Sequence, residues 1–129
     1  MAQNTEEQML RELYSKFAAG DLPGVLAMCS DDIIFRVPGT NPLAGAYTNT
    51  TFADLIGKVM QISAGTFRED VVDIVANKDH AVAILDHAFE RDGTKIAYRT
   101  DHIWQLRDGK FCGWLERPGD QEAFDRVWA

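Results

Sequence analysis

Asp101, Glu116 and Arg99 carry the clearest chemical signal in this sequence of 129 residues. Residues 107–110 are Arg-Asp-Gly-Lys, and the Asp-Gly pair is typical of a two-residue type I′ hairpin turn. In an unbulged hairpin built on that turn, Asp101 lies opposite Glu116, and Arg99 shares their face of the sheet. The same register places Ile103 opposite Trp114, so we expect these charges to lie in apolar surroundings.

A carboxyl group in apolar surroundings has a raised pKa and can serve as a general acid or base. We therefore predict that Asp101 is the acid–base group of a pocket, with Arg99 stabilising negative charge that develops on the substrate. Ile103, Trp114 and Glu116 would contact that substrate. The alternative is a plain ion pair of Arg99 with Asp101 or Glu116 that only orients the sheet, and the sequence leaves both open.

The preceding strand adds Asp86 and His87, of which only one can face the pocket because side chains alternate along a strand. A plain two-residue turn at Asp92-Gly93 places Asp86 opposite Arg99, whereas a bulged turn places His87 there. His87 in the pocket would be a proton shuttle near neutral pH. Asp86 in the pocket would bind substrate, and the sequence leaves both arrangements open.

The elements that must position these side chains follow from the spacing of apolar residues. Helical spacing predicts helices over residues 5–19, 22–30 and 52–64, with a short helix after Asp120. Alternating patterns predict strands over residues 33–37, 67–76, 80–91, 95–107 and 110–117. This order indicates an α+β fold, with helices packed on one face of a curved antiparallel sheet.

Both faces of that sheet carry apolar groups. If the helices cover the face of Asp101, the other face, with His102 and Trp104, would be an exposed apolar patch. A homodimer through this outer sheet face is then expected. The alternative is that His102 and Trp104 are ordinary core residues and the face of Asp101 is partly solvated.

The stretch FRVPGTNPLAGAY, residues 35–47, holds two prolines, two glycines and an asparagine between an apolar run and a helix. We interpret it as the rim of a pocket, with Phe35 against the substrate and Arg36 at the entrance as a possible anion-stabilising group.

Composition excludes several classes of function. The net charge of −7 and pI near 4.8 argue against a nucleic-acid partner, which needs a cationic surface. The two cysteines are far apart, which is typical of reduced thiols. The start MAQNTEEQML lacks the pattern of a signal peptide, and the longest apolar run, AVAIL, is far too short to span a membrane. We expect one domain over residues 1–129, a cytoplasmic location and no membrane partner.

The chain resembles the SnoaL-like branch of the NTF2-like superfamily over nearly its whole length. Three features carry the resemblance: the order of the elements, the stretch VPGTNPLAGAY, and the stretch TDHIWQLRDGKFCGWLERPGDQEAFDRVW. The resemblance implies a cone-shaped α+β fold with a pocket between the curved sheet and the helices, and frequent dimers. The family includes ketosteroid isomerases, polyketide cyclases, dehydratases and epoxide hydrolases, so the fold alone does not fix the reaction.

Ketosteroid isomerase gives a residue-level comparison, since it uses an aspartate base, a tyrosine and a protonated aspartate. Alignment on the Gly109 turn places the protonated aspartate at Asp101. The base position falls on Arg36, and the tyrosine position falls one residue before Tyr14. The resemblance therefore implies Asp101 and Tyr14 in the pocket and argues against ordinary steroid isomerisation. Polyketide cyclases of the family imply an Asp with a nearby His, here Asp101 with His87.

Two hypotheses remain. The first is an isomerase, cyclase, dehydratase or hydrolase acting on an apolar ring-bearing small molecule, with no cofactor. The second is a non-catalytic ligand-binding or dimerisation module in which Arg36 and Arg99 clamp a carboxylate. No metal is expected, because the three histidines of the chain lack the spacing of ligands on one helix.

Overall fold

The computed structural model describes residues 4–129. The helices are α1 (Thr5–Ala18), α2 (Leu22–Ala27), α3 (Phe52–Ile62) and α4 (Gln121–Trp128). The strands are β1 (Cys29–Val37), β2 (Gly45–Tyr47), β3 (Arg68–Ala76), β4 (His80–Arg91), β5 (Thr94–Arg107) and β6 (Lys110–Pro118).

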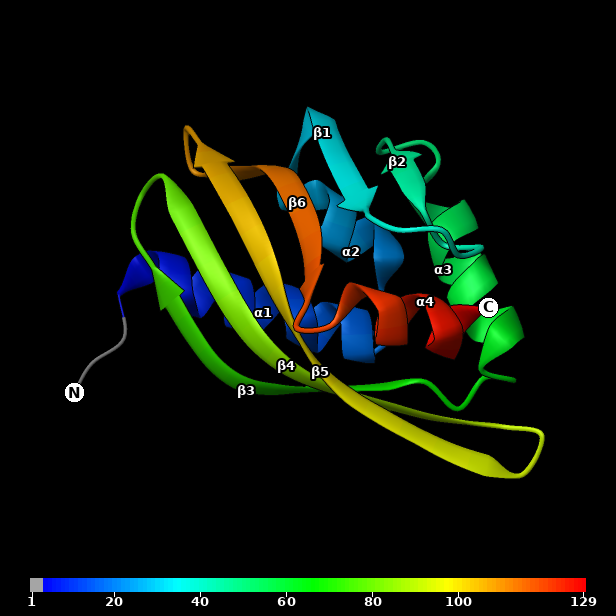
Figure 1. Ribbon diagram of the computed structural model, residues 1–129. Coiled ribbons are helices and arrows are strands. Elements are labelled where there is room, and N and C mark those ends of the chain that lie inside the picture. The colour runs from blue at the N-terminus through cyan, green and yellow to red at the C-terminus, as the bar shows by residue number, and fades with distance from the viewer. Residues whose placement is uncertain (1–3) are drawn as a thin grey trace.

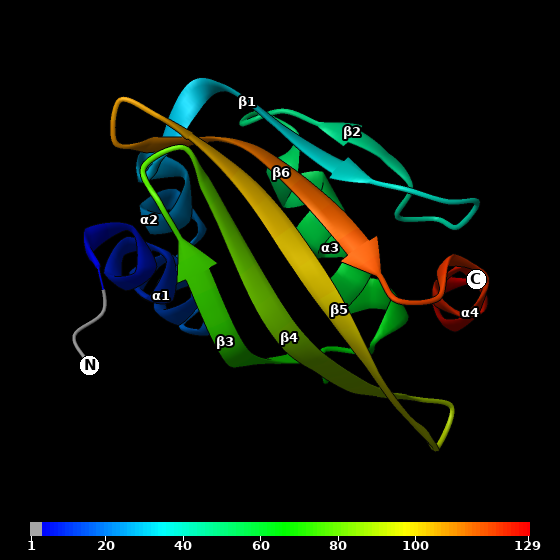
Figure 2. The ribbon, with the colours of Figure 1, turned by 60° about the vertical axis from the view of Figure 1, so that its left-hand side comes forward.

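The strands form one curved sheet in the order β2-β1-β6-β5-β4-β3, in which only β1 and β6 run parallel. Helices α1, α2 and α3 lie against the same side of this sheet, and α4 lies beside the end of β6 (Figures 1 and 2). The predicted α+β fold, with a curved sheet around the N-terminal helices, is confirmed. The predicted loop after residue 37 contains the short edge strand β2.

Acidic and amide side chains fix where three of the helices begin. Asn4 accepts a hydrogen bond from the backbone N–H of Glu7 at 2.8 Å, and so caps α1. Asp21 and Asp120 cap α2 and α4 in the same way. Helix α1 packs on β3 and β4 and buries Leu10, Leu13 and Tyr14.

The β5–β6 hairpin contains the predicted Asp-Gly turn, with both central residues at positive φ. Beyond the turn, Leu106 pairs with Phe111, but Gln105 pairs with Gly113. Cys112 is therefore an extra residue, and the strand contains a β-bulge. Every residue of β6 after Cys112 is displaced by one position relative to the unbulged pairing.

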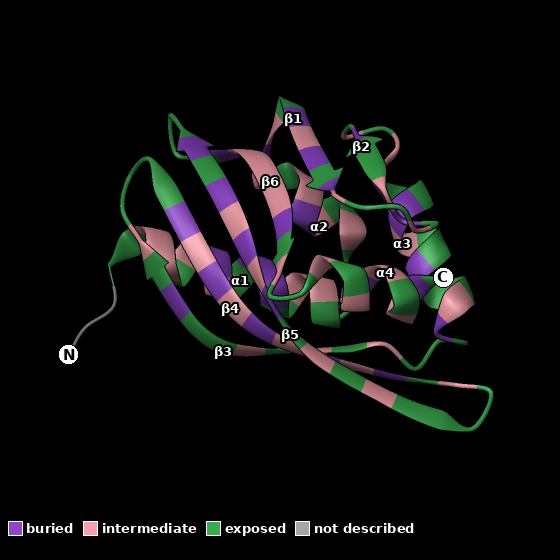
Figure 3. Ribbon diagram, viewed as in Figure 1, coloured by how far each residue is buried: buried purple, intermediate pink, exposed green. Residues whose placement is uncertain are grey.

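This bulge moves Trp114 and Glu116 to the face of β5 that carries His102 and Trp104. Glu116 lies opposite His102 rather than Asp101, and Trp114 lies opposite Trp104. His102, Trp104 and Glu116 are buried. Buried residues alternate with more exposed ones along β5 (Figure 3). The prediction that Asp101 faces the pocket is therefore wrong. The alternative, that His102 and Trp104 are core residues and the face of Asp101 is partly solvated, is confirmed. The residues that point to the outer face instead are Arg99, Asp101 and Ile103.

The β4–β5 hairpin has the plain two-residue turn, so Asp86 lies opposite Arg99 and His87 lies opposite Tyr98. The Asp86 carboxylate accepts two hydrogen bonds from Arg99, at 2.8 and 3.1 Å, on the exposed outer face. The prediction of Asp86 in the pocket is wrong, as is the bulged turn. His87 is 3% exposed and lies on the concave face.

One hydrophobic cluster fills the space between the sheet and the helices, with Leu10, Ile33, Phe35, Leu85 and Trp128 among its most buried members. The single domain over residues 1–129 stays a prediction, and residues 1–3 lie outside the described part of the chain. No helix between residues 4 and 129 has both the length and the apolar character needed to cross a membrane.

Candidate functional site

A cavity lies between the concave face of the sheet and the helices. Its walls are mainly aliphatic and aromatic side chains from α1, α3 and β1, together with all three tryptophans of the chain, Trp104, Trp114 and Trp128. The side chains that line it include no lysine or arginine. Its polar lining residues are Tyr14, Glu69, His87, Tyr98, His102 and Glu116.

His102 on β5 connects α1 to β6 at one wall of the cavity. Its Nδ1 lies 2.7 Å from the Tyr14 hydroxyl, and its Nε2 lies 3.2 Å from a carboxylate oxygen of Glu116. Thr100 donates a hydrogen bond to the other carboxylate oxygen, and Trp104 Nε1 donates to the Tyr14 hydroxyl at 3.1 Å. A neutral His102 protonated at Nε2 gives each donor of this hydrogen-bonded row an acceptor. Its Nε2–H donates to Glu116, and its Nδ1 accepts from the Tyr14 hydroxyl.

The surroundings of His102 and Glu116 favour opposite charges on these two side chains. Burial works to lower the pKa of His102, but the nearby Glu116 carboxylate outweighs it, so the net shift is upward. Burial likewise works to raise the pKa of Glu116, and His102 more than offsets it, so the net shift is downward. Burial raises the pKa of Tyr14 well above its usual value, which keeps its hydroxyl protonated as a hydrogen-bond donor.

A second buried chain is centred on His87 of β4. Its Nε2 lies 2.7 Å from a carboxylate oxygen of Glu69 on β3, and its Nδ1 lies 2.9 Å from the Tyr98 hydroxyl. Trp128 Nε1 donates to the same hydroxyl at 3.0 Å, which ties α4 to the sheet. Burial is the main reason why the pKa of Tyr98 is raised.

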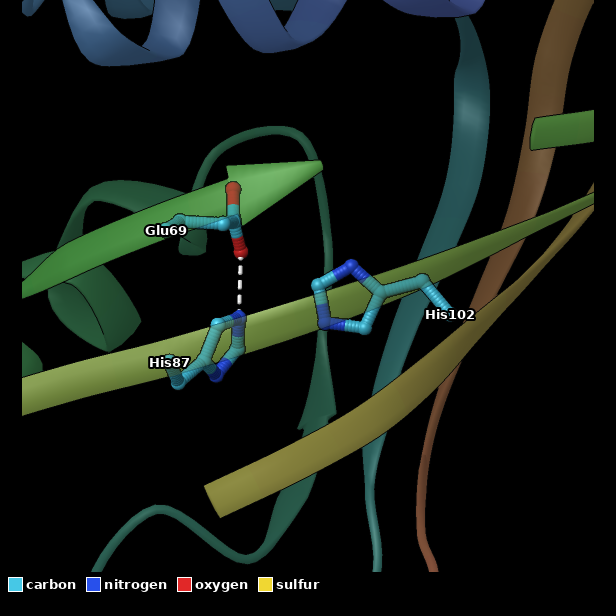
Figure 4. A group of neighbouring side chains, drawn as sticks. All are labelled: Glu69, His87 and His102. Atoms are coloured by element: carbon cyan, nitrogen blue, oxygen red, sulfur yellow. Dashed lines mark hydrogen bonds and ion pairs between the residues drawn. The ribbon is translucent and has the colours of Figure 1, made fainter. Parts of the chain in front are cut away.

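The two chains meet inside the cavity. The rings of His87 and His102 lie 5.5 Å apart between centroids, and Figure 4 shows a His102 ring nitrogen turned toward His87 and Glu69. One nitrogen or oxygen from each of Glu69, His87 and His102 lies within 4.8 Å of the other two. Two imidazoles with carboxylate partners can accept, hold and donate protons at neighbouring points of one bound molecule.

The loop after β1 forms part of the cavity wall and is tied to α4. Asp125 accepts hydrogen bonds from the Thr40 backbone N–H at 3.1 Å and from Asn41 Nδ2 at 2.7 Å. Gly39 has a φ of 101°, and a Cβ there would lie 2.1 Å from Asp125 Oδ1. Glycine is therefore required for this close approach, which holds Leu43 in the lining.

Comparison with known proteins now adds the family. The family model of the SnoaL-like domain matches residues 10–114. This chain belongs to the SnoaL-like family. Members of this fold bind small molecules, and the cavity of this SnoaL-like domain lies between the sheet and the helices, as the resemblance implied.

Three solved structures share the fold with identities too low to show more than that. Bal32a, from a soil-derived mobile gene cassette, has a TM-score of 0.86 at 19% identity over 95% of each chain. An NTF2-like protein of unknown function from Burkholderia pseudomallei has a TM-score of 0.86 at 20% identity, over 98% of this chain and 99% of that one. TerC, co-crystallised with polyporic acid, has a TM-score of 0.81 at 20% identity, over 93% and 95%. The uncharacterized protein Rv0034 of Mycobacterium tuberculosis is 23% identical over the full length of both chains.

The SnoaL-like domain brings together some of the predicted site residues and excludes others. The predicted residues that line the cavity are Tyr14, Phe35, His87, Trp114 and Glu116. The predicted residues that lie outside it are Arg36, Asp86, Arg99, Asp101 and Ile103. Arg36 is exposed and lies on the outer side of β1, because its neighbours Phe35 and Val37 point inward. Its expected role as an anion-stabilising pocket residue is therefore wrong.

Sequence reasoning missed Glu69, Tyr98 and His102 as site residues of the SnoaL-like domain. The signal for His102 was present, since Tyr98, His102 and Trp104 alternate as one apolar and aromatic set. Only the face of the sheet predicted for these residues is wrong. Glu69 gave no such signal, because it lies on a strand whose own pattern is half exposed.

Proposed function

We propose that this SnoaL-like protein catalyses proton transfer on a small apolar ring-bearing molecule bound in the cavity, as an isomerase, cyclase, dehydratase or hydrolase. The observation that carries the proposal is the pair of buried imidazole–carboxylate contacts, His102 with Glu116 and His87 with Glu69, at the wall of an otherwise apolar cavity. Buried polar groups grouped in an apolar pocket are the usual composition of a small-molecule site.

The hydrogen bonds support one role for each group in this proposal. Glu116 holds the imidazole of His102 in place, so that Nδ1 exchanges a proton with the Tyr14 hydroxyl. When His102 is protonated at both nitrogens, Nδ1–H donates to the Tyr14 oxygen, and the single Tyr14 proton is free to be donated to a substrate oxygen that gains negative charge. His87, held by Glu69 and Tyr98, is the second acid–base group. Phe35 and Trp114 hold the ring of the substrate.

The lining also indicates the charge of the substrate. Glu69 and Glu116 lie in the cavity wall, and neither lysine nor arginine lines it. An anionic ring compound would therefore meet like charge in a poorly solvated site. We expect a neutral substrate with a carbonyl or hydroxyl oxygen, and not the carboxylate that an arginine-lined pocket would bind.

The test uses a neutral carbon acid and an anionic ring of similar size. With 2-tetralone in D₂O, the protein is expected to accelerate exchange of the α-protons, followed by NMR. Quenching of tryptophan fluorescence reports binding, because all three tryptophans line the cavity. 2-Naphthoate is expected to quench less than 2-tetralone at equal concentration.

Variants decide whether the named groups carry the reaction. His102→Gln is expected to lose the exchange while it still binds 2-tetralone. His80→Gln is the matched control, because His80 is exposed at the start of β4 and lies outside the cavity. Exchange at the wild-type rate in His102→Gln would overturn the proposal. Binding of 2-tetralone without exchange in the wild-type protein would favour the non-catalytic ligand-binding module.

A second proposal concerns assembly. We propose that the protein forms a homodimer through the outer sheet face, whose apolar residues differ from those expected. Cross-strand neighbours Val75, Val82, Ile103 and Leu115 form a band over β3, β4, β5 and β6. Val75 is 64% exposed and continues the apolar surface of its neighbours, and contiguous exposed apolar patches mark interfaces.

A cytoplasmic location stays a prediction.

The oligomeric state tests this assembly. Sedimentation velocity is expected to show a dimer for the wild-type protein and a monomer for Ile103→Arg. A monomeric wild-type protein across the micromolar range would contradict the dimer.

A further inference from the structure

The point where the two buried histidines meet has a second chemical capability. Glu69, His87 and His102 present one carboxylate oxygen and two imidazole nitrogens to the same small volume (Figure 4). Two histidines and one carboxylate are the ligand set of many catalytic zinc and non-haem iron sites. We propose that these three side chains bind one divalent metal ion of the Zn²⁺ type at the wall of the cavity.

The spacing of the ligand atoms fits this proposal. His87 Nε2 lies 2.7 Å from Glu69 Oε2, and one ligand atom of each residue lies within 4.8 Å of the others. Ligands about 2.0–2.2 Å from one Zn²⁺ ion lie roughly 3.3 Å apart in tetrahedral geometry. The contact between His87 and Glu69 is shorter than that value and the other separations do not exceed 4.8 Å, so small side-chain rotations would bring the three atoms to a common ion.

The tyrosines hold both imidazoles in the orientation that such a site requires. The Tyr98 hydroxyl lies 2.9 Å from His87 Nδ1, and the Tyr14 hydroxyl lies 2.7 Å from His102 Nδ1. Metal binding would move the His102 proton from Nε2, where it faces Glu116 in the metal-free arrangement, to Nδ1. Each Nδ1–H would then donate to its tyrosine oxygen, and each Nε2 would offer a lone pair to the ion. A metal-binding histidine almost always donates its other N–H in this way.

Charge balance supports the same conclusion. Glu69 and Glu116 bring two carboxylates into a cavity wall where no lysine or arginine is present. A buried carboxylate is stable only when an opposite charge compensates it. In the metal-free chain a protonated His102 can compensate Glu116. One divalent cation bound between two neutral imidazoles would take over that compensation and extend it to Glu69, and Thr100 would continue to hold Glu116.

This inference goes beyond the proposed proton transfer, which requires no metal. It also departs from the expectation that no metal takes part, because that expectation considered helical spacing only. The ligands lie on adjacent strands β3, β4 and β5, far apart in sequence. Three protein ligands leave a coordination position open toward the cavity, where a substrate oxygen or water would bind.

The test measures metal binding directly, on the tag-free full chain stripped with EDTA. Isothermal titration with Zn²⁺ is expected to show one ion per chain, and Co²⁺ is expected to give a visible absorption band of a low-coordinate site. His87→Gln and Glu69→Gln are expected to abolish stoichiometric binding and the band. Tyr98→Phe is expected to weaken binding by roughly 10- to 100-fold, because it removes only a supporting hydrogen bond.

His80→Gln is the matched control and is expected to bind like the wild type, because His80 is the one histidine outside the cavity. Absence of stoichiometric binding to the folded wild-type chain overturns the proposal, whatever the variants do. Binding that survives in Glu69→Gln and His87→Gln, or that His80→Gln removes, also overturns it. Exchange of 2-tetralone protons by the EDTA-treated protein reports the proposed function separately.

Discussion

The two faces of β5 carry similar polar groups with opposite surroundings. On the outer face, Arg99 donates to Asp86, and their side chains are 60% and 50% exposed. On the concave face, His102 contacts Glu116, and their side chains are 5% and 7% exposed. Exposed ion pairs contribute little to the free energy of unfolding because water and salt screen them. Removal of one partner of a buried pair lowers the free energy of unfolding strongly, because it leaves an uncompensated buried charge.

This contrast shows where chemistry is built in the molecule. The outer pair lies on the solvent-exposed surface of the sheet. The concave pair is extended by the hydrogen bond of His102 with Tyr14 on α1 and by the ring contact of His102 with His87 on β4. One residue, Cys112, decides which set of β6 side chains joins the concave pair.

Deletion of Cys112 is expected to have the largest effect. Without the bulge, β6 must lose either the pairing of Phe111 or the inward positions of Trp114 and Glu116. We expect the free energy of unfolding to fall by more than about 4 kcal/mol, the range of exceptional core damage. Urea denaturation and near-ultraviolet circular dichroism measure the loss.

Cys112→Ala is the control, because it keeps the extra residue and removes only a half-buried thiol. Its free energy of unfolding should stay within about 1 kcal/mol of the wild type. If the deletion were as stable as Cys112→Ala, the bulge would not determine the faces of the sheet.

The bulge also explains which parts of the fold can be predicted from the sequence and which cannot. Periodicity and turn residues predicted the helices, the meander and both hairpin turns, because these depend on local residue types. The face of each β6 residue depends on whether one extra residue is accommodated, which neither Cys112 nor Gly113 signals by type. For this reason the sequence predicts Asp101 inside and His102 outside. The contact of Glu69 with His87 is not predicted, because it depends on how β3 pairs with β4.

Glu116→Ala is expected to have the next largest effect. It leaves buried His102 and Thr100 without their carboxylate partner, so the free energy of unfolding should fall by about 3–5 kcal/mol. Asp86→Ala is the matched outer-face variant and should not change stability measurably in the same urea titration. Equal losses in the two variants would mean that burial does not separate the two faces.

Tyr14→Phe tests whether the concave pair extends into α1. The variant keeps the ring but leaves Trp104 Nε1 and His102 Nδ1 without their shared hydroxyl. A buried group that loses its partner costs about 1–3 kcal/mol, so we expect a loss of that size in the free energy of unfolding. A variant as stable as the wild type would show that the two groups find other partners inside the cavity.

The smallest effect is expected for the coupling between Asp86 and Arg99. A double-mutant cycle with Asp86→Ala and Arg99→Ala should give a coupling near the detection limit at low salt. The coupling should vanish at about 1 M salt, where charges are screened over about 3 Å. The same cycle on His102 and Glu116 should change little with salt, because the helices exclude water and ions from that pair. A salt-dependent coupling on the concave face would mean that solvent reaches the pair through the cavity.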